Sequence, residues 1–486
     1  MSASRKSIQT LIGQIFIFVQ SIALTPIFIK TSGPTVYGAY ILLLSYMGLI
    51  FGISSLGVGV TAKRFLPSTN DLIERSKLFY PQFNFQMLAV ALLGLGSALF
   101  FQINIEAMQL QFAGFCGWLI PVYLVAYTLY GQTSDYFRYT HRVGFFNAAI
   151  VAQPYIFVVI ALGIYWQIGV ISPNTLIVSL TIACLFVGLG MFFKMKSEIG
   201  FRVDIPKTRN LKNEMVIGFP LVMVFLVDFT LSVGDRYVIA AMMSVKDVGY
   251  YVPAYMLGSF IMIVPKVFGV VIPPLISKHM DSGDLIQAKT LSESAASLFL
   301  LIAIPYTFGA IVLGRTLLEI YTSSDISEAT WQVIPIVALA SIFYGLVVIK
   351  NNILLVRLRT GTLFKVNLVC SILNIFLNVI LLWILNNVVY AAVATLITYV
   401  LSYYLLCRKI NLDQIDFVIS KNLLFNIILS STIMLITIYC FLFFTKFENK
   451  FTNLFLIILG GITFFIVFFG QKSNQNYFKK IIQELK

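Results

Sequence analysis

The sequence predicts an all-α integral membrane protein of about fourteen transmembrane helices, arranged as two parallel six-helix lobes plus two extra C-terminal helices. Composition is the first reason. Hydrophobic residues make up 59% of the 486 residues and charged residues only 11%, whereas a soluble chain usually carries about 25% charged residues. The mean hydropathy of +0.90 agrees. The second reason is a series of apolar stretches, and the third is an internal repeat.

Each predicted span is a predominantly apolar stretch of roughly 19 residues or more, long enough to cross a bilayer. The connections are short, so almost no sequence remains to fold in water. The spans occupy residues 11–29, 38–60, 83–101, 112–131, 146–166, 175–193, 215–234, 248–276, 295–313, 331–355, 362–385, 388–407, 423–444 and 454–470.

Basic residues sort to one side of the predicted membrane. Alternate loops carry Lys and Arg, whereas loops 102–111 and 167–174 on the other side carry neither. The positive-inside rule therefore places both termini in the cytoplasm, which requires an even number of spans. The net charge of +14 is a topology signal, and no nucleic-acid partner is expected. We expect a multi-pass membrane protein.

The start of the chain imitates a signal peptide. Arg5 and Lys6 precede the apolar residues 11–29, but no small-residue cleavage site follows. The sequence therefore predicts an uncleaved first helix.

Two motifs repeat at nearly the same offset. Asp71-Leu72-Ile73 recurs as Asp284-Leu285-Ile286, and residues 36–40 resemble residues 247–251. The offset corresponds to six spans, so the two halves have the same orientation and are related by an axis along the membrane normal. The predicted division is an N-terminal six-helix lobe, a basic cytoplasmic linker, a second six-helix lobe, and a segment with two further helices and an amphipathic tail. These parts cover residues 1–193, 194–214, 215–407 and 408–486.

A few ionisable residues interrupt the spans, although a charge at mid-bilayer costs at least about 2.5 kcal/mol on insertion scales. Asp228 lies near the middle of span 215–234, and Lys266 lies at a similar depth in the next span. They either form a structural ion pair or face a wet cavity, and their offset favours the cavity. Arg236 closes its span at the outer face. Lys350 either extends to the cytoplasmic interface or faces the same cavity.

Amides form another polar group. Asn367, Asn374 and Asn378 are spaced i, i+7, i+11 and share one helix face. They either bond neighbouring helices or line a polar pathway, and Asn374 and Asn378 are candidates for the cavity wall.

The five cysteines and two histidines form no pattern typical of a disulfide framework or a metal site. The sequence predicts no catalytic set and no resident cofactor, and thus a protein that is not an enzyme.

The seventh and eighth spans carry a family resemblance. Gly218-Phe219-Pro220-Leu221, Asp228, the run 232–239 and Val248-Gly249-Tyr250-Tyr251 are similar to the polysaccharide-type members of the multidrug/oligosaccharidyl-lipid/polysaccharide exporter superfamily. These members are the Wzx-like flippases of O-antigen and capsule units. Residues 37–40, followed by a glycine-rich stretch and Lys63-Arg64, resemble the same family, as do the span count and the six-plus-six-plus-two layout.

The resemblance implies an alternating-access carrier that moves a polyprenyl-diphosphate-linked oligosaccharide to the outer leaflet, driven by an ion gradient. A diphosphate is strongly anionic, so cavity residues Arg236, Lys266 and Lys350 would lower the cost of its passage. Asp228 is the candidate coupling site for a proton or a sodium ion. Expected partners are the lipid-linked anionic glycan, the bilayer, and glycan polymerase or chain-length proteins.

Two alternatives stay open. One is a multidrug or small-cation exporter of the same fold, and the other is a membrane-embedded glycan polymerase or acyltransferase.

Overall fold

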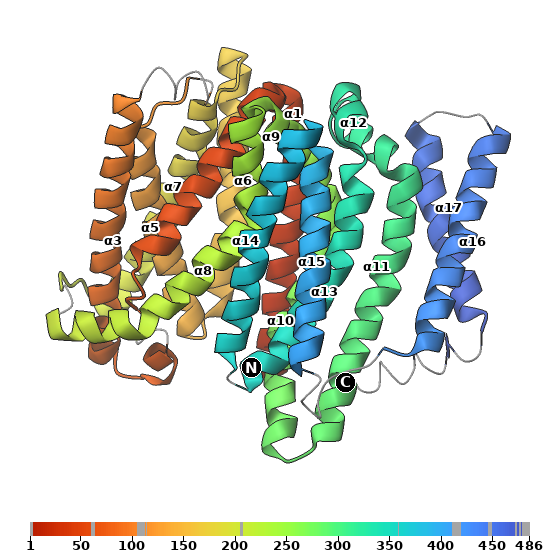
Figure 1. Ribbon diagram of the computed structural model, residues 1–486. Coiled ribbons are helices and arrows are strands. Elements are labelled where there is room, and N and C mark those ends of the chain that lie inside the picture. Colours follow the sequence, from red (N-terminus) through yellow and green to blue (C-terminus); the bar gives the residue numbers. More distant parts are fainter. Residues whose placement is uncertain are drawn as a thin grey trace. The chain divides into compact units, whose positions relative to one another are not determined.

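The computed structural model describes residues 3–59, 64–104, 112, 114–204, 208–357, 359–410, 419–445, 450–471, 474, 475 and 478. Every regular element in these residues is helical (Figure 1). The helices are α1 (Ala3–Ser54), α3 (Leu72–Ile103), α5 (Leu119–Tyr139), α6 (Val143–Ile168), α7 (Pro173–Ile199), α8 (Thr208–Met242), α9 (Val245–Gly258), α10 (Ile263–Asp281), α11 (Leu285–Tyr321), α12 (Ser324–Thr330), α13 (Val333–Val356), α14 (Thr360–Leu385), α15 (Val389–Ile410), α16 (Lys421–Thr445) and α17 (Lys450–Phe469), with 3-10 turns η1 (Leu66–Ser68) and η2 (Ser259–Met262).

The predicted fold class is confirmed, because each of the fourteen predicted spans overlaps a helix. The first two spans share α1, which turns at Gly33, where φ is 77° and ψ is 167°. The eighth covers α9, η2 and α10. In the described part of the chain, 11 helices are long and apolar enough to cross a membrane. The predicted amphipathic tail, residues 477–485, lies outside the described residues apart from Phe478.

The chain divides into two compact units, Met1–Gly249 and Tyr250–Lys486. The first unit contains α1 to α8 and the start of α9, and the second contains the remaining helices. This division does not test the predicted linker between the two repeats at residues 194–214, which stays a prediction.

In the first unit, α5 packs against α1, α3, α6 and α7. Aromatic side chains fill the core at one end of these helices. Phe79, Tyr80, Tyr136 and Phe137 are at most 1% exposed, and the ring centroids of Phe79 and Tyr136 lie 5.3 Å apart, edge to face.

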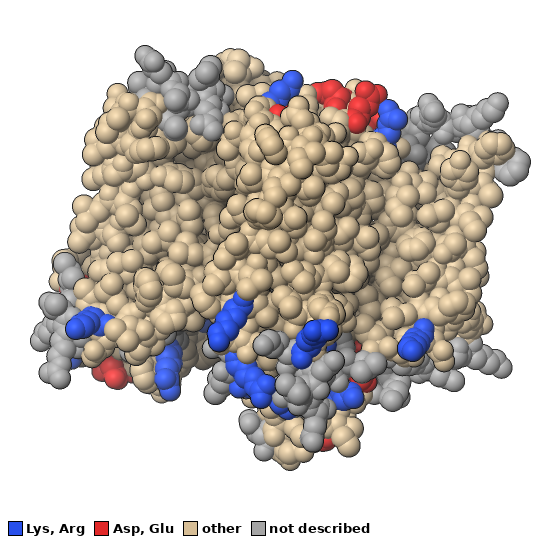
Figure 2. Space-filling model, in the orientation of Figure 1, with Lys and Arg blue, Asp and Glu red and all other residues tan. Residues whose placement is uncertain are grey.

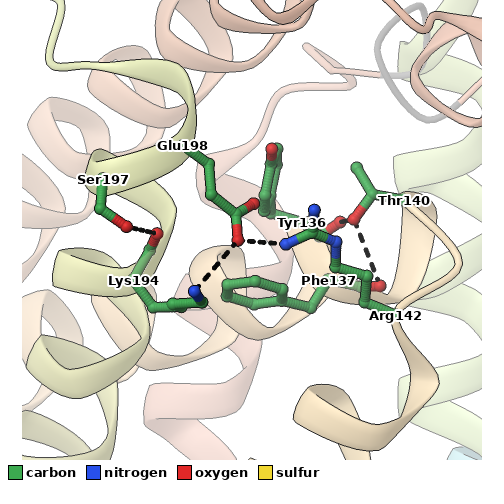
Figure 3. A network of polar contacts seen from close by, with 7 residues as sticks. All are labelled: Tyr136, Phe137, Thr140, Arg142, Lys194, Ser197 and Glu198. Atoms are coloured by element: carbon green, nitrogen blue, oxygen red, sulfur yellow. Dashed lines mark hydrogen bonds and ion pairs between the residues drawn. The ribbon is translucent and has the colours of Figure 1, made fainter.

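One polar network ties α6 to α7 in this unit (Figure 3). The Glu198 carboxylate accepts a charge-assisted hydrogen bond from the Arg142 guanidinium, and the Lys194 ammonium lies 3.7 Å from the same oxygen. Two cations therefore share one carboxylate where α6 begins and α7 ends.

In the second unit, α13 packs against α10, α11, α14 and α15, while α11 packs against α16 and α17. Phe299 of α11 is fully buried. A Cβ at Gly345 of α13 would lie 2.3 Å from the Phe299 ring, so the absence of a side chain at residue 345 makes room for it.

The repeated motif performs the same task in both units. The Asp71 carboxylate accepts hydrogen bonds from the backbone N–H groups of Ile73 and Glu74 at the start of α3. The Asp284 carboxylate accepts one from Gln287 at the start of α11, at 3.0 Å. Each aspartate therefore caps the first turn of a long helix, where N–H groups lack partners within the helix.

Charge is distributed as expected of a membrane protein. In the face drawn in Figure 2, Lys and Arg side chains lie along the lower rim, and the belt above them is almost free of charge. The assignment of this rim to the cytoplasm stays a prediction from the positive-inside rule.

Glycines join α1 closely to α8 and α9 in the first unit. A Cβ at Gly38 would lie 2.1 Å from the Val245 carbonyl oxygen, and one at Gly249 would lie 1.9 Å from that of Pro34. Just after the end of α1, a Cβ at Gly57 would lie 2.4 Å from the Cα of Gly218 in α8. We call these two places the glycine seam. In lipid, where apolar surfaces gain little by meeting, such close backbone approach is a principal source of helix association.

We expect Gly249→Ala to destabilise the protein by about 1–3 kcal/mol, because the added methyl group meets a backbone carbonyl that cannot move aside alone. Gly48→Ala is the matched control, since Gly48 lies in α1 with nothing within 4 Å of the added Cβ. Alanine there should be neutral or stabilising by up to about 1 kcal/mol. Thermal unfolding of purified protein in one detergent measures both, and equal midpoints would contradict the seam.

Candidate functional site

The six predicted site residues fall in both units. Asp228 and Arg236 lie on α8 of the first unit, whereas Lys266, Lys350, Asn374 and Asn378 lie on α10, α13 and α14 of the second. Their surroundings are therefore described separately for each unit.

On α8, the two carboxylates have different surroundings. The Asp228 side chain is exposed, and its backbone carbonyl accepts a hydrogen bond from the Ser232 hydroxyl at 2.8 Å. Asp235, two turns further on, is only 4% exposed. Its carboxylate accepts a hydrogen bond from the backbone N–H of Arg236 at 2.8 Å. Asp228 is thus the more accessible of these two carboxylates to an ion that approaches from outside the unit.

Lys266 lies just after an interruption of the α-helix in the eighth span. The α-helix gives way to the 3-10 turn η2 after Gly258 and resumes at Ile263, so Lys266 stands in the first turn of α10. A Cβ at Gly258 would lie 2.7 Å from the Ile334 carbonyl oxygen, which means that α13 closely approaches the chain at this break. The Lys266 side chain is exposed.

Lys350 is buried inside the second unit, with 1% of its surface exposed. Its ammonium lies 5.8 Å from the centre of the Tyr403 ring of α15, within cation–π range. Of the two interpretations that the sequence left open for Lys350, extension to the interface does not fit this burial.

The two amides bond within the helix pair α14–α15. Asn374 and Asn378 are both 0% exposed. The Asn378 amide donates to the Asn374 side-chain oxygen at 3.0 Å, and the Asn374 amide donates to the Thr398 hydroxyl of α15 at 3.4 Å. These are the bonds expected of an interhelical connection. A role for these amides in the cavity wall stays a prediction.

An apolar crevice runs beside α11, α16 and α17 in the second unit, with a volume of about 440 Å³. Ile302 of α11 and Phe465 and Phe469 of α17 contribute to its lining. Gly461 faces open space in the same crevice, since nothing lies within 4 Å of an added Cβ.

Sequence reasoning missed the polar face of α5. This helix overlaps the predicted span 112–131, but it is not among the 11 helices that are long and apolar enough to cross a membrane, because tyrosines and other polar residues interrupt it. Tyr123, Tyr127 and Tyr130 follow each other at helical spacing. This spacing was the only sign in the sequence of a polar face on α5, and it is equally typical of an aromatic core.

No family model and no curated protein sequence matches this chain. Solved structures do match. The lipid II flippase MurJ, in an inward closed conformation, is 16% identical with a TM-score of 0.71, and the match covers 99% of this chain and 100% of MurJ. The MATE multidrug transporter DinF-BH, in complex with rhodamine 6G, is 16% identical with a TM-score of 0.60, covering 87% of this chain and 96% of DinF-BH.

A third match is an inward-facing multidrug resistance MATE family transporter of the MOP superfamily. It is 11% identical with a TM-score of 0.61, and the match covers 83% of this chain and 95% of that transporter. This chain therefore has the multi-pass, two-lobed helical fold shared by MurJ and the MATE transporters.

Proposed function

We propose that this protein is an alternating-access flippase that moves a polyprenyl-diphosphate-linked oligosaccharide from the inner to the outer leaflet of a bacterial cytoplasmic membrane. The observation that carries the proposal is the extent of the structural match. The fold of a lipid II flippase accounts for 99% of this chain, whereas the DinF-BH match accounts for 87%.

The charges of the spans support an anionic cargo. Lys266 is exposed on α10, and Lys350 places a second ammonium in the interior of the same unit. Each ammonium group is strongly hydrated in water, so placing it in a membrane costs free energy. An anionic diphosphate that binds it would offset that cost. Within the described residues, no group of three or more His, Cys, Asp and Glu side chains is arranged for a metal ion.

The apolar crevice supports a lipid cargo. Its volume of about 440 Å³ is comparable to the smaller ligand sites of proteins, which measure roughly 300–1,000 Å³. Its aliphatic and aromatic lining matches a hydrocarbon chain. A polyprenyl segment lying there would remain in an apolar environment while the head group crosses.

Asp228 is proposed as the coupling site, with either a proton or a sodium ion as the coupling ion. Neutralising this carboxylate from the outside would change the charge that the anionic cargo meets. Release of the ion to the cytoplasm would then restore the starting state. The proposed protein partners, a glycan polymerase and chain-length proteins, would act on the cargo after its release.

A multidrug or small-cation exporter is the second candidate, and the MATE matches favour it, including DinF-BH in complex with rhodamine 6G. The two functions require cargoes of opposite charge. Proteoliposomes loaded with an undecaprenyl-diphosphate-linked oligosaccharide in one experiment and rhodamine 6G in another distinguish them. We expect an imposed ion gradient to expose the sugar to a membrane-impermeant glycosidase without moving rhodamine 6G. The reverse pattern would support the exporter.

Lys266→Ala should lower glycolipid translocation by about tenfold or more, because it removes the exposed cation of α10. Lys266→Arg keeps the charge and should retain most activity, which would show that charge matters more than shape at residue 266. Both variants must reach the membrane at the wild-type level. Unchanged translocation by Lys266→Ala would exclude Lys266 from the cargo path.

Asp228→Asn should bind cargo normally but lose gradient-driven translocation, because the amide keeps the shape of the carboxylate and does not ionise. Binding and translocation are measured separately in the same preparation, under a proton gradient and then a sodium gradient. If the variant shows the wild-type dependence of translocation on either the proton gradient or the sodium gradient, the coupling role of Asp228 is refuted.

Gly461→Leu should lower translocation of the glycolipid while leaving the protein as stable as the wild type or more so. An added Cβ at Gly461 meets nothing within 4 Å, so a leucine side chain extends into the crevice. Leucine also has a higher helix propensity than glycine by roughly 1 kcal/mol. Ile458→Leu is the control, since Ile458 lies on the same helix and is 54% exposed. Equal effects of the two variants on translocation would argue against a lipid chain in the crevice.

A further inference from the structure

The helix α5 has an unusual composition for its position. It contacts α1, α3, α6 and α7 within the first unit, and Figure 1 shows it among these helices. Its 21 residues correspond to roughly 31 Å at 1.5 Å per residue, enough to cross a bilayer. A spanning helix with many polar residues directs them inward, toward a protein interior or a wet space.

Three tyrosines on α5 share one face. Tyr123, Tyr127 and Tyr130 are separated by four and three residues, the spacing of neighbours on a helix surface. The rings of Tyr123 and Tyr127 stack with centroids 5.6 Å apart, and the Tyr127 and Tyr130 centroids lie 6.1 Å apart. Phe51 of α1 meets the Tyr127 ring edge to face at 4.8 Å. The three tyrosine rings therefore pack against one another and against Phe51, which fixes their positions.

Tyr40 of α1 is the fourth tyrosine of the group, and it lies within electrostatic range of the Tyr123 hydroxyl, as does Cys184 of α7. The Gln153 amide of α6 donates to the Cys184 sulfur at 3.7 Å. We call Tyr40, Tyr123, Tyr127 and Tyr130 the tyrosine array.

The hydroxyl groups of the array are unsatisfied by the described part of the protein. Among the residues whose side chains are described, which leave out residues 3–24 of α1, none of the four has a hydrogen-bond partner, and none of the four oxygens is a fully enclosed unpartnered atom. Buried tyrosine hydroxyls normally find a partner. An array of open hydroxyls inside a helix bundle therefore requires water or a polar ligand.

The scaffold of the array is fixed by a second set of contacts. The Gln132 amide of α5 donates to the Gln86 side-chain oxygen of α3. The Gln86 amide in turn donates to the Ser54 hydroxyl of α1 at 3.3 Å. These bonds tie α5 to its neighbours away from the tyrosines, as a preorganised site needs.

We propose that the tyrosine array binds the sugar portion of the cargo, an inference that rests on the proposed function. Each phenol both donates and accepts a hydrogen bond, and a sugar offers several groups of each kind. The site is neutral, so it suits the uncharged part of the glycolipid and leaves the diphosphate to cationic residues elsewhere.

An organic cation fits the array less well. Cation–π binding requires open ring faces, and here the rings pack against one another and against Phe51. The neighbouring carboxylate, Asp135, is paired with Arg138 at 3.0 Å. The hydroxyls are what the array offers to a ligand.

The test is equilibrium binding to the full chain in nanodiscs. The probes are radiolabelled undecaprenyl diphosphate, bare and carrying glucose, galactose, N-acetylglucosamine, N-acetylgalactosamine or rhamnose. The wild type should bind at least one glycosylated form more tightly than the bare carrier. The double variant Tyr127→Phe, Tyr130→Phe keeps both rings and removes two hydroxyls. It should weaken that binding by about tenfold, since each hydrogen bond contributes modestly, and leave the bare carrier unaffected.

Controls separate the failures. Tyr155→Phe removes an exposed hydroxyl from α6 and should change neither affinity. Equal loss for bare and glycosylated carriers in the double variant, or no sugar preference in the wild type, would overturn the sugar site alone. Lost rhodamine 6G binding with unchanged glycolipid binding would make the array a cation site. If the wild type binds no polyprenyl diphosphate at all, the proposed function fails, and the sugar site with it.

Discussion

A bilayer offers no hydrogen-bond partners, and this constraint governs the whole molecule. Backbone groups must bond within helices, which accounts for the all-helical architecture of the described chain. Helices must also associate without the usual gain from burying apolar surface. Glycines that bring backbones together, as at Gly38 and Gly249 of the seam, supply close packing instead. Polar side chains inside spans then mark places where the protein itself provides a polar environment.

Polar groups inside the spans perform two kinds of task. Asn374, Asn378 and Thr398 are hydrogen-bonded to one another across α14 and α15, so they connect a helix pair. The tyrosine array has no such partners within the described chain, and Lys266 is exposed at a helix break. Groups of the second kind are the ones that a polar cargo would use. An anionic head group, a neutral sugar and an apolar chain call for different surfaces, and the two units offer surfaces of all three kinds.

Much of the fold follows from the sequence, because hydropathy alone locates helices that must cross a bilayer. The repeated Asp71 and Asp284 also mark equivalent helix starts in the sequence, and both aspartates cap those helices. Side-chain partners could not be predicted in this way. The burial of Lys350 against Tyr403 depends on the packing of α13 and α15. The surroundings of Tyr127 and Tyr130 likewise depend on how α1, α3, α6 and α7 pack around α5. A single sequence shows spacing along one helix and contains no distances between helices.

The central claim is that the protein carries an anionic glycolipid. Native mass spectrometry of the protein, extracted gently with its membrane lipids, tests this most directly. We predict a bound species whose mass equals a polyprenyl diphosphate plus sugar residues and which mild acid cleaves at the glycosyl diphosphate. The claim would be contradicted if the protein carried only phospholipids and if rhodamine 6G displaced the bound species whereas undecaprenyl diphosphate did not.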